Sequence, residues 1–329
     1  MGKLKPNKKG KYLIGVDMGG TNLRAGLVDL EGKVLGEAHR PSHAEEGMKK
    51  SVEMTIEAAR EVIESRSIKK EEICGIGLAV PGNHKSGEGI CLYSPNFAPP
   101  FPVPVLEPIE KALGLAAYML NDVNTAALGE HRFGAGRGYD NMVMITLGTG
   151  IGGGAVVDGQ LRVGPTEGFA EVGHMIIDPE GPQCGCGNHG CWEALAGKDA
   201  IIERAVFELQ QGESSLLMEL AKGDINAITP SLIAQAAEQE DELAQAVLDE
   251  TAYWVGIGCV NLITLYNPQV LVIGGGIAGA LPLMEPTLQQ VVNARARMVP
   301  ASTCKIVPSA LGDDAGIIGG AVLVIRELQ

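Results

Sequence analysis

The sequence predicts an α/β protein built from two similar lobes around a central cleft. Apolar strands alternate with amphipathic helices along the chain, and a glycine-rich hairpin opens each half. The two hairpins, 17–29 (DMGGTNLRAGLVD) and 146–158 (TLGTGIGGGAVVD), align without a gap and both end in Val-Asp. Hairpins resemble one another by chance, but each of these begins its own half of the chain. The repeat therefore favours a duplicated lobe.

Composition and charge narrow the class of protein. The chain has 329 residues, 45% of them hydrophobic and 20% charged, which is ordinary for a soluble globular protein. A net charge of −14 argues against a nucleic-acid partner, whose phosphates require a basic face. No apolar run reaches the roughly 18 residues that cross a membrane. The basic stretch 3–11 lacks the apolar core of a signal peptide, and we expect a disordered tail in a cytoplasmic protein.

The first half begins with a predicted three-stranded meander. Strands are expected at 12–16, 23–29 and 33–38, because glycine-bearing turns separate these apolar runs. A helix over 50–65 follows from apolar residues at helical spacing. Further elements are a strand at 73–80, a proline-rich surface or cleft loop at 95–108, a strand at 118–121 and a helix at 123–131.

The second half repeats the pattern and then becomes helical. Strands are predicted at 142–146, 155–157, 270–273 and 305–307, and helices at 198–210, 230–238, 241–265, 283–297 and 314–327. We expect a small lobe of residues 1–121, completed by the C-terminal helix 312–329, and a large lobe of residues 122–311. Gly316, Gly319 and Gly320 in the last helix would allow close packing where the chain returns.

Two glycine turns are candidates for holding a polyphosphate. Glycines lack Cβ, so the backbone N–H groups of such a turn can approach a phosphate closely. The first turn offers Asp17, Gly19, Gly20 and Thr21, and the second offers Thr146, Gly148, Thr149 and Gly150. Each turn alone is equally well explained as a tight hairpin. Neither has the Gly-Lys-Ser/Thr of a Walker loop, and strands rather than helices follow them.

A third glycine cluster ends a predicted buried strand. Gly274, Gly275 and Gly276 would leave room for an adenine or a ribose, although a simple turn before a helix explains them as well.

Five segments together resemble the ROK family. They are DMGGTNLRAG, LNDVNTAALGE, TLGTGIGGG, EVGH and CGCGNHGCWE, and the resemblance covers nearly the whole chain from residue 12. The family groups sugar kinases with sugar-responsive repressors. The resemblance implies a two-lobed actin-like ATPase (ribonuclease H-like) fold, with ATP and Mg²⁺ between the glycine turns and Asp17 reaching Mg²⁺ through water.

The resemblance also implies a sugar site. It makes Asp122 the general base that accepts the sugar hydroxyl proton and Asn121 a sugar contact, although an Asn-Asp pair at a strand end is equally well explained as a helix N-cap. Asn96 matches the sugar-contact loop of the family, and Gly82 and Asn83 are expected to approach the sugar. Relatives often carry tryptophan shortly after that asparagine, where this chain has Phe97.

A histidine and three clustered cysteines predict a structural zinc. The chain has seven cysteines, and His174, Cys184, Cys186 and Cys191 form a tetrahedral set of one nitrogen and three sulfurs. A disulfide within the cluster would leave an odd thiol. Such a closed site positions residues rather than performing chemistry. The resemblance implies that Glu171 and Glu193 accept hydrogen bonds from sugar hydroxyls, with His174 beside them.

The sequence therefore predicts an ATP:hexose 6-phosphotransferase that acts on glucose. N-acetylmannosamine, fructose and mannose remain alternative substrates, and polyphosphate an alternative donor. A sugar-sensing, non-catalytic ROK regulator is the alternative from another class, but only about eleven residues precede the first strand, too few for a DNA-binding domain. The expected partners are the sugar and ATP, without nucleic acid or membrane, in a homodimer or homotetramer.

Overall fold

The computed structural model describes residues 4–329, and the chain forms two compact units. The first unit comprises the chain up to Asp140 together with Gly154–Phe169 and Ala310–Gln329. The second comprises Asn141–Gly153 and Ala170–Ser309. Lys3, at the start of the predicted tail, lies outside the described residues. No helix within residues 4–329 is both long and apolar enough to cross a bilayer.

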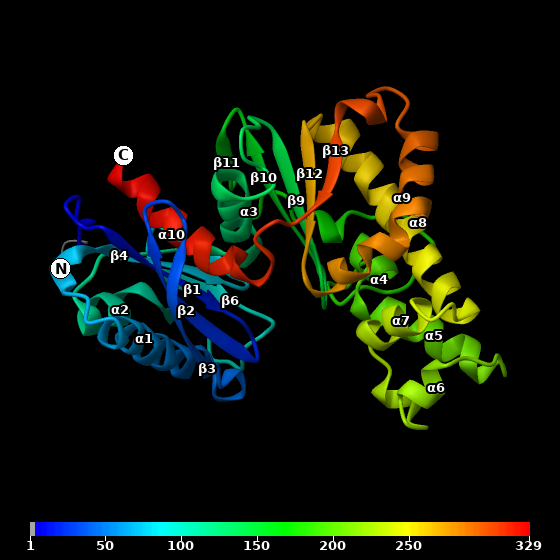
Figure 1. Ribbon diagram of the computed structural model, residues 1–329, viewed down its shortest axis with the longest axis horizontal. Helices are drawn as coiled ribbons and strands as arrows, with labels where there is room; N and C mark the ends of the chain where they lie inside the picture. Colours follow the sequence, from blue (N-terminus) through cyan, green and yellow to red (C-terminus); the bar gives the residue numbers. More distant parts are fainter. Residues whose placement is uncertain (1–3) are drawn as a thin grey trace. The chain divides into compact units, whose positions relative to one another are not determined.

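The first unit is built on a five-stranded sheet in the order β3-β2-β1-β4-β8 (Figure 1). β1 and β3 run antiparallel to β2, whereas β1, β4 and β8 are parallel to one another. The bounds of these strands are β1 Tyr12–Met18, β2 Asn22–Asp29, β3 Val34–Pro41, β4 Ile73–Val80 and β8 Ala117–Asn121. A small antiparallel sheet holds β5 Asn83–Lys85, β6 Ile90–Tyr93 and β7 Val103–Pro104.

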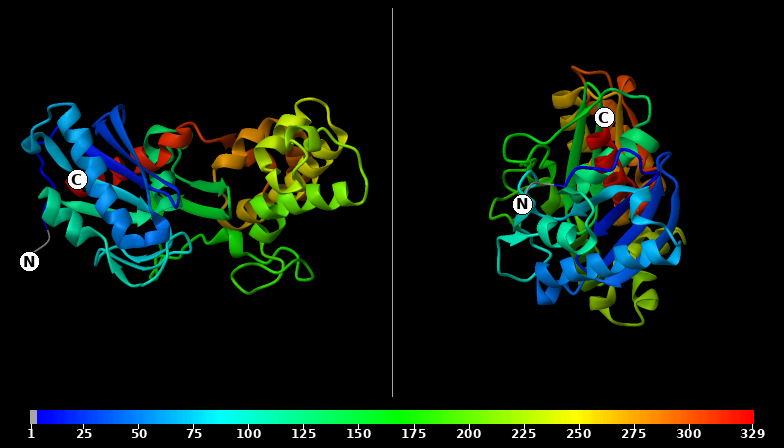
Figure 2. Two further views of the ribbon diagram at one scale, coloured as in Figure 1. Left: turned by 90° about the horizontal axis from the view of Figure 1, so that it is seen from below. Right: turned by 90° about the vertical axis from the view of Figure 1, so that its left-hand side faces the viewer.

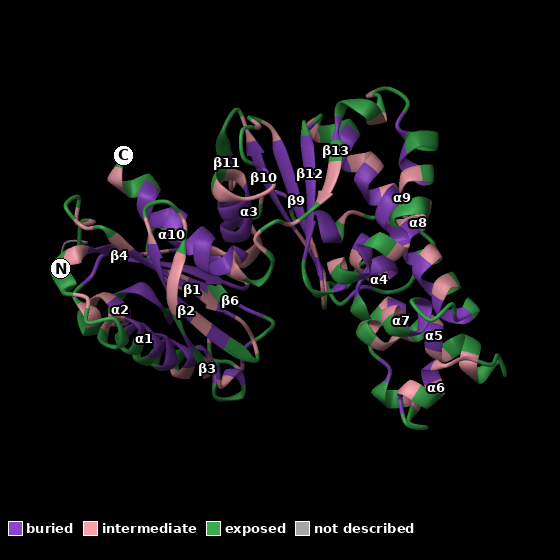
Figure 3. Ribbon diagram, viewed as in Figure 1, coloured by how far each residue is buried: buried purple, intermediate pink, exposed green. Residues whose placement is uncertain are grey.

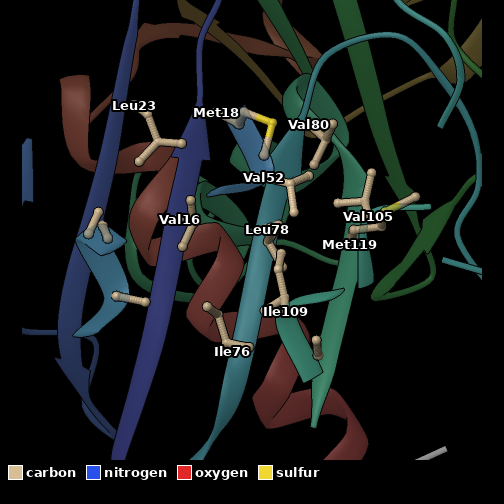
Figure 4. Close-up of a cluster of buried hydrophobic side chains, with 14 of the residues drawn as sticks. Val16, Met18, Leu23, Val52, Ile76, Leu78, Val80, Val105, Ile109 and Met119 are labelled. Carbon is tan, nitrogen blue, oxygen red and sulfur yellow. The ribbon is translucent and has the colours of Figure 1, made fainter. Parts of the chain in front are cut away.

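Helices cover both faces of this sheet, which explains why β4 is buried along its whole length. α1 (Met48–Ser65) and α2 (Leu106–Leu113) pack on one face, where Val16, Val52 and Ile109 belong to one hydrophobic core (Figure 4). α10 (Ala315–Leu328) lies on the other face and buries Ile317 and Ala321 against Leu13 and Val28. α3 (Asp122–Phe133) packs beside α10.

A second five-stranded sheet repeats the strand order of the first. It runs β11-β10-β9-β12-β13, and β9, β12 and β13 are parallel. Of its strands, β11 and most of β10 fall within Gly154–Phe169 of the first unit. Each sheet thus places three consecutive strands side by side, followed by two parallel strands from later in the chain. The strands are β9 Met142–Leu147, β10 Ile151–Val157, β11 Gln160–Arg162, β12 Val270–Gly274 and β13 Lys305–Pro308. The central strands β9 and β12 are buried (Figure 3).

Six helices complete the second unit. α4, α5 and α7 gather around the long helix α8, and α9 packs along it (Figure 2). Their bounds are α4 Trp192–Ala196, α5 Lys198–Gln210, α6 Leu217–Leu220, α7 Pro230–Ala237, α8 Glu242–Tyr266 and α9 Leu281–Arg295. Short 3₁₀ helices are η1 Ala44–Glu46, η2 Lys70–Glu72, η3 Val172–His174, η4 Ile225–Ala227, η5 Gly276–Ala280, η6 Ala301–Thr303 and η7 Gly312–Asp314.

Three features differ from the sequence prediction. The stretch before β1 is not a free tail, because Asn7 donates its backbone N–H to the Cys74 carbonyl at 2.8 Å and its side-chain amide to the Glu71 carbonyl at 2.7 Å. α2 and the small sheet arise where a proline-rich loop is expected, since Val103 and Val105 bury their side chains. The compact units also differ from the predicted lobes in keeping α3 with the first unit, because α3 packs against α10.

Candidate active site

The carboxyl ends of three parallel strands bring predicted site residues together in the first unit. Asp17 lies near the end of β1, Gly82 follows β4, and Asn121 ends β8. In register, Asp17 pairs with Ala79, and Val80 pairs with Asn121. Ligands of open α/β sheets bind outside this edge. The sheet thus collects the predicted metal carboxylate, base and sugar contacts at one edge.

In the first glycine turn, the carbonyls of Gly20 and Thr21 are bound by Ser42, whereas two N–H groups are unpaired. Gly19 donates to the Asn22 carbonyl at 3.0 Å, and a Cβ on Gly19 would lie 2.7 Å from that oxygen. Ser42 binds the Gly20 carbonyl through its hydroxyl at 2.6 Å and the Thr21 carbonyl through its N–H at 3.0 Å. Within residues 4–329, the N–H groups of Gly20 and Thr21 have no acceptor. Two such donors suit an anion.

Asp17 carries an unusual charge environment beside this turn. Burial, and after it the charge of Asp122, raise the pKa of Asp17 to about 6 against the opposing effect of Arg24. A Cβ on Gly316 would lie 2.6 Å from the Asp17 Cγ, so the carboxylate rests against the start of α10. A carboxylate whose pKa is raised by a second negative charge nearby favours a cation beside it.

Asn121 is the N-cap of α3, and Asp122 is the first residue of that helix. The Asn121 Oδ1 accepts the N–H groups of Val123 at 3.0 Å and Asn124 at 3.3 Å. Its Nδ2 lies 3.5 Å from the Gly82 carbonyl. The capping interpretation therefore holds for Asn121, whose side chain links the helix start to the chain after β4. Asp122 is half-buried at the same edge.

The predicted sugar loop lies against the phosphate turn. Asn96 is exposed, and a Cβ on Gly20 would lie 3.2 Å from the Asn96 Nδ2. Gly82 has a φ of 109°, and a Cβ there would lie 2.2 Å from the Tyr93 carbonyl oxygen, so only glycine fits. Asn83 is exposed and pairs with Tyr93 at the start of β5. The fold thus brings Asn96 and Gly20 together and keeps Asn83 near the same strand end.

The second unit carries an equivalent turn between β9 and β10. Gly148 donates to the Gly150 carbonyl at 2.9 Å and accepts the Lys198 N–H at 3.0 Å. The N–H groups of Thr149 and Gly150 have no acceptor in the described part of the chain. Both turns therefore share one property, two successive unpaired backbone donors. Thr146 at the end of β9 pairs in register with Gly274.

The third glycine cluster lies beside this second turn. Gly275 has a φ of 89°, and a Cβ on it would lie 2.3 Å from the Leu147 carbonyl oxygen. A Cβ on Gly276 would meet nothing within 4 Å, so there is open space next to the turn. The structure thereby brings Thr146, Gly148, Thr149, Gly150 and the residues Gly274–Gly276 into one region of the second unit.

His174, Cys184, Cys186 and Cys191 converge as predicted. Their ligand atoms all lie within 4.8 Å of one another. The Cys184 Sγ is 3.7 Å from the His174 Nδ1, and the Cys186 and Cys191 sulfurs are 3.7 Å apart. In a tetrahedron with metal–sulfur bonds of roughly 2.3 Å, two sulfurs lie roughly 3.8 Å apart. The donor set and its spacing therefore fit a zinc ion.

Glu193 ties this cluster to the second turn, a contact that sequence reasoning missed. Its Oε2 accepts the Ile151 N–H at 3.0 Å, and its Oε1 lies 3.9 Å from the Cys184 Sγ. A Cβ on Gly150 would lie 2.0 Å from the same Oε2. Glu171 is exposed. It lies beside this region, because Gly173, two residues later, packs its backbone against the Ile151 carbonyl. Gly150, the second glycine of TLGTG, is therefore explained by its packing against Glu193 as well as by the expected phosphate binding.

The fold defines an α/β protein of the two-lobed actin-like ATPase class, as the sequence predicts. The chain belongs to the ROK family, which it matches over residues 13–327. It is 36% identical to a glucokinase from Thermotoga maritima over 96% of this chain and 98% of that protein.

Solved structures of both catalytic and regulatory relatives share the fold. A Streptomyces griseus ROK glucokinase, solved with glucose and AMPPNP, superposes with a TM-score of 0.83 at 31% identity, covering 96% of this chain and 99% of that one. A ROK transcriptional regulator, a homologue of the Escherichia coli MLC protein, gives a TM-score of 0.87 at 29% identity, over 98% of this chain and 79% of that one.

Proposed function

We propose that this protein transfers the γ-phosphoryl group of ATP to the 6-hydroxyl of glucose. The observation that carries the proposal is the first unit's strand edge, where a turn with two unpaired N–H groups, Asp17 and Asp122 lie beside Asn96. An anion cradle, a metal carboxylate and a general base are the parts that phosphoryl transfer to an alcohol requires. The similarity to glucokinases supports glucose as the alcohol that is phosphorylated.

Asp122 is the general base in this proposal. As the glucose O6 forms its bond to the γ-phosphorus, the bond from that phosphorus to the β–γ bridging oxygen breaks and ADP leaves. The O6 proton passes to the Asp122 carboxylate, because the hydroxyl becomes acidic along this coordinate. Asn121 holds the start of α3 rigid, so that the base keeps its direction.

The glycine turns hold the nucleotide. The unpaired N–H groups of Gly20 and Thr21, and those of Thr149 and Gly150, donate to phosphate oxygens. Asp17 would hold Mg²⁺, and the ion would supply positive charge beside the transferring group. The open space at Gly276 receives the ribose or the adenine.

The cysteine cluster supplies a structural zinc site. His174, Cys184, Cys186 and Cys191 would hold the ion, which would add rigidity rather than chemistry. The loop so formed fixes Glu171, His174 and Glu193. The two glutamates accept hydrogen bonds from sugar hydroxyls, and His174 donates one. Asn96 and Asn83 contact the sugar from the first unit.

A direct assay tests this function. ADP release is measured with Mg²⁺ and either ATP or polyphosphate, over glucose, mannose, fructose and N-acetylated hexosamines. The proposal expects the highest kcat/KM with ATP and glucose, and glucose 6-phosphate as product by mass and NMR analysis. Preference for another sugar would change the assigned substrate but leave the reaction class unchanged.

The regulatory relatives define the competing result. If calorimetry shows glucose binding, but no ADP forms with any of these sugars, the protein is a sugar sensor rather than a kinase.

A further inference from the structure

The segment 310–316 brings the chain back into the first unit. Ser309 belongs to the second unit, and the residues from Ala310 onward belong to the first. We call 310–316 the return segment. Two charged side chains of the first unit hold it, and neither is among the predicted site residues.

Glu130 holds the beginning of the return segment. This glutamate lies on α3, about two turns after Asp122, and its side chain is wholly buried. Its Oε1 accepts the Leu311 N–H at 2.8 Å, and its Oε2 accepts those of Ala310 at 3.2 Å and Ala135 at 2.7 Å. A buried carboxylate is tolerated where donors of this kind surround it. A Cβ on Gly134 would lie 2.1 Å from the Oε2, so glycine makes room for it.

Arg24 holds the middle of the return segment. Its two terminal nitrogens donate to the Asp313 carbonyl at 2.5 Å and to the Asp314 carboxylate at 2.6 Å. One of them also reaches Glu37 at 2.7 Å. Arg24 sits opposite Asp17 in the ladder of β1 and β2. Residues paired in this way have neighbouring side chains.

The end of the return segment contacts the Asp17 side chain itself. Gly316 packs its backbone so close to Asp17 that a Cβ there would lie 2.6 Å from the Cγ. The segment therefore connects the helix that presents Asp122 to the strand that presents Asp17, through Glu130 at one end and through Arg24 and Gly316 at the other.

We propose that Glu130 and Arg24 are positioning residues, which hold the return segment so that Asp17 and Asp122 keep the spacing that phosphoryl transfer needs. Neither is assigned a contact with substrate, and the inference rests on the proposed kinase function. Misplacement of a reacting group by about 1 Å lowers turnover about 100-fold, whereas substrate affinity depends on other contacts. A loss confined to kcat therefore distinguishes positioning from general stabilisation.

The decisive variant is Glu130→Gln, which keeps the shape but turns an amide NH₂ toward backbone N–H groups. We expect kcat to fall about 10- to 100-fold while the KM values for glucose and ATP change less than about 3-fold. Hydrogen exchange of the Ala310 and Leu311 amides should become faster. The matched control is Glu110→Gln, because Glu110 also accepts one backbone N–H, that of Ala117 at 3.1 Å, away from the return segment.

Three results would overturn the proposal. The first is a Glu130→Gln kcat within about 2-fold of wild type. The second is a kcat loss that disappears when activity is normalised to the folded fraction. The third is an equal kcat loss in Glu110→Gln.

If Glu130→Gln does not fold, Arg24→Lys decides the matter. It keeps the charge but cannot reach Asp313, Asp314 and Glu37 together. A selective kcat loss there supports the proposal, and an unchanged kcat overturns it. Wild-type protein that phosphorylates none of the sugars would instead refute the kinase function, while the exchange rates still report whether Glu130 holds the segment.

Discussion

Asp17 rests its carboxylate directly on the backbone of Gly316, where a Cβ would lie 2.6 Å from the Asp17 Cγ. This contact joins the first strand of the chain to its last helix. It means that the position of the proposed metal carboxylate depends on a glycine 299 positions later (316 − 17). We expect any side chain at residue 316 to displace Asp17.

Gly316→Ala therefore should lower kcat by about 100-fold, because a shift of about 1 Å at a reacting group has that effect. Alanine is otherwise favoured over glycine in a helix by about 1 kcal/mol, so the melting temperature alone would mislead. Steady-state kinetics with ATP and glucose make the measurement. Gly279→Ala is the control, since a Cβ there meets nothing within 4 Å. Full activity of Gly316→Ala would contradict the close contact.

Asp122→Asn should retain glucose affinity and lose turnover. The amide cannot accept the hydroxyl proton, and a general base contributes roughly 10²- to 10⁴-fold to the rate. Calorimetric titration with glucose and single-turnover assays separate binding from chemistry. Activity within about 10-fold of wild type would refute the assignment of the base.

Asp17→Asn should stabilise the metal-free protein at neutral pH while removing activity. Folding raises the pKa of Asp17 from 3.8 to about 6, so the folded state binds the extra proton between these values. Stability is therefore lost as the pH rises through this window, and the ionised carboxylate costs about 3 kcal/mol above it. Urea unfolding with EDTA at pH 7.5 and pH 4 measures the gain, which should vanish at pH 4. Asp158→Asn, whose parent side chain is 80% exposed, should show no gain at either pH.

His84 should make the protein lose stability in mild acid. It is 3% exposed, its Nε2 has no hydrogen-bond partner among residues 4–329, and burial lowers its pKa to about 4 against an opposing hydrogen bond to Pro81. The unfolded chain has an ordinary histidine pKa near 6.5, so between about pH 4 and pH 6.5 it binds the proton more readily than the folded chain does. The neutral imidazole thus supports folding above about pH 6.5, and up to about 3 kcal/mol of that stability is lost as the pH falls through 4.

Unfolding curves between pH 7 and pH 4 test this for His84→Leu, which should flatten the pH dependence. His39→Leu, replacing a side chain that is 64% exposed, should leave the slope as in wild type. Equal slopes in all three proteins would contradict the role of His84.

Cys184→Ser should release the zinc and weaken sugar binding together. We expect about one zinc per chain in the wild type and well under one in the variant, with a glucose KM raised about 10- to 100-fold. Metal analysis and kinetics on the same preparations measure both. His189→Gln changes an exposed residue of the same loop that is not in the ligand cluster, and it should affect neither. Normal glucose KM in zinc-free protein would contradict the link.

Local patterns predict those parts of the fold that depend on neighbouring residues. The strand predicted at 73–80 and the helix predicted at 198–210 have the bounds of β4 and α5, because burial and helix propensity act within a few residues. The glycine turns and the ligand cluster are also found from spacing, since each lies within one short stretch. The duplicated strand order follows from the alignment of two hairpins.

Contacts between distant positions cannot be predicted in this way. Glu130 and Ala310 are 180 positions apart, and Arg24 and Asp314 are 290 apart, so no periodicity relates them. Sequence order places a lobe boundary before Asp122, whereas packing between α3 and α10 decides where α3 belongs. α2 was missed because the prolines around it suggest a loop, although its Leu106 and Ile109 are buried.

The placement of α10 has a consequence for biosynthesis. Its Ile317, Ala321 and Val324 cover the sheet face that carries Leu13 and Val28. During translation that face stays open until α10 itself leaves the ribosome, by which time the intervening unit has all of its own residues. We expect nascent chains that stop short of residue 310 to expose this apolar surface and to recruit chaperones, so the first strands made are among the last to reach their native surroundings.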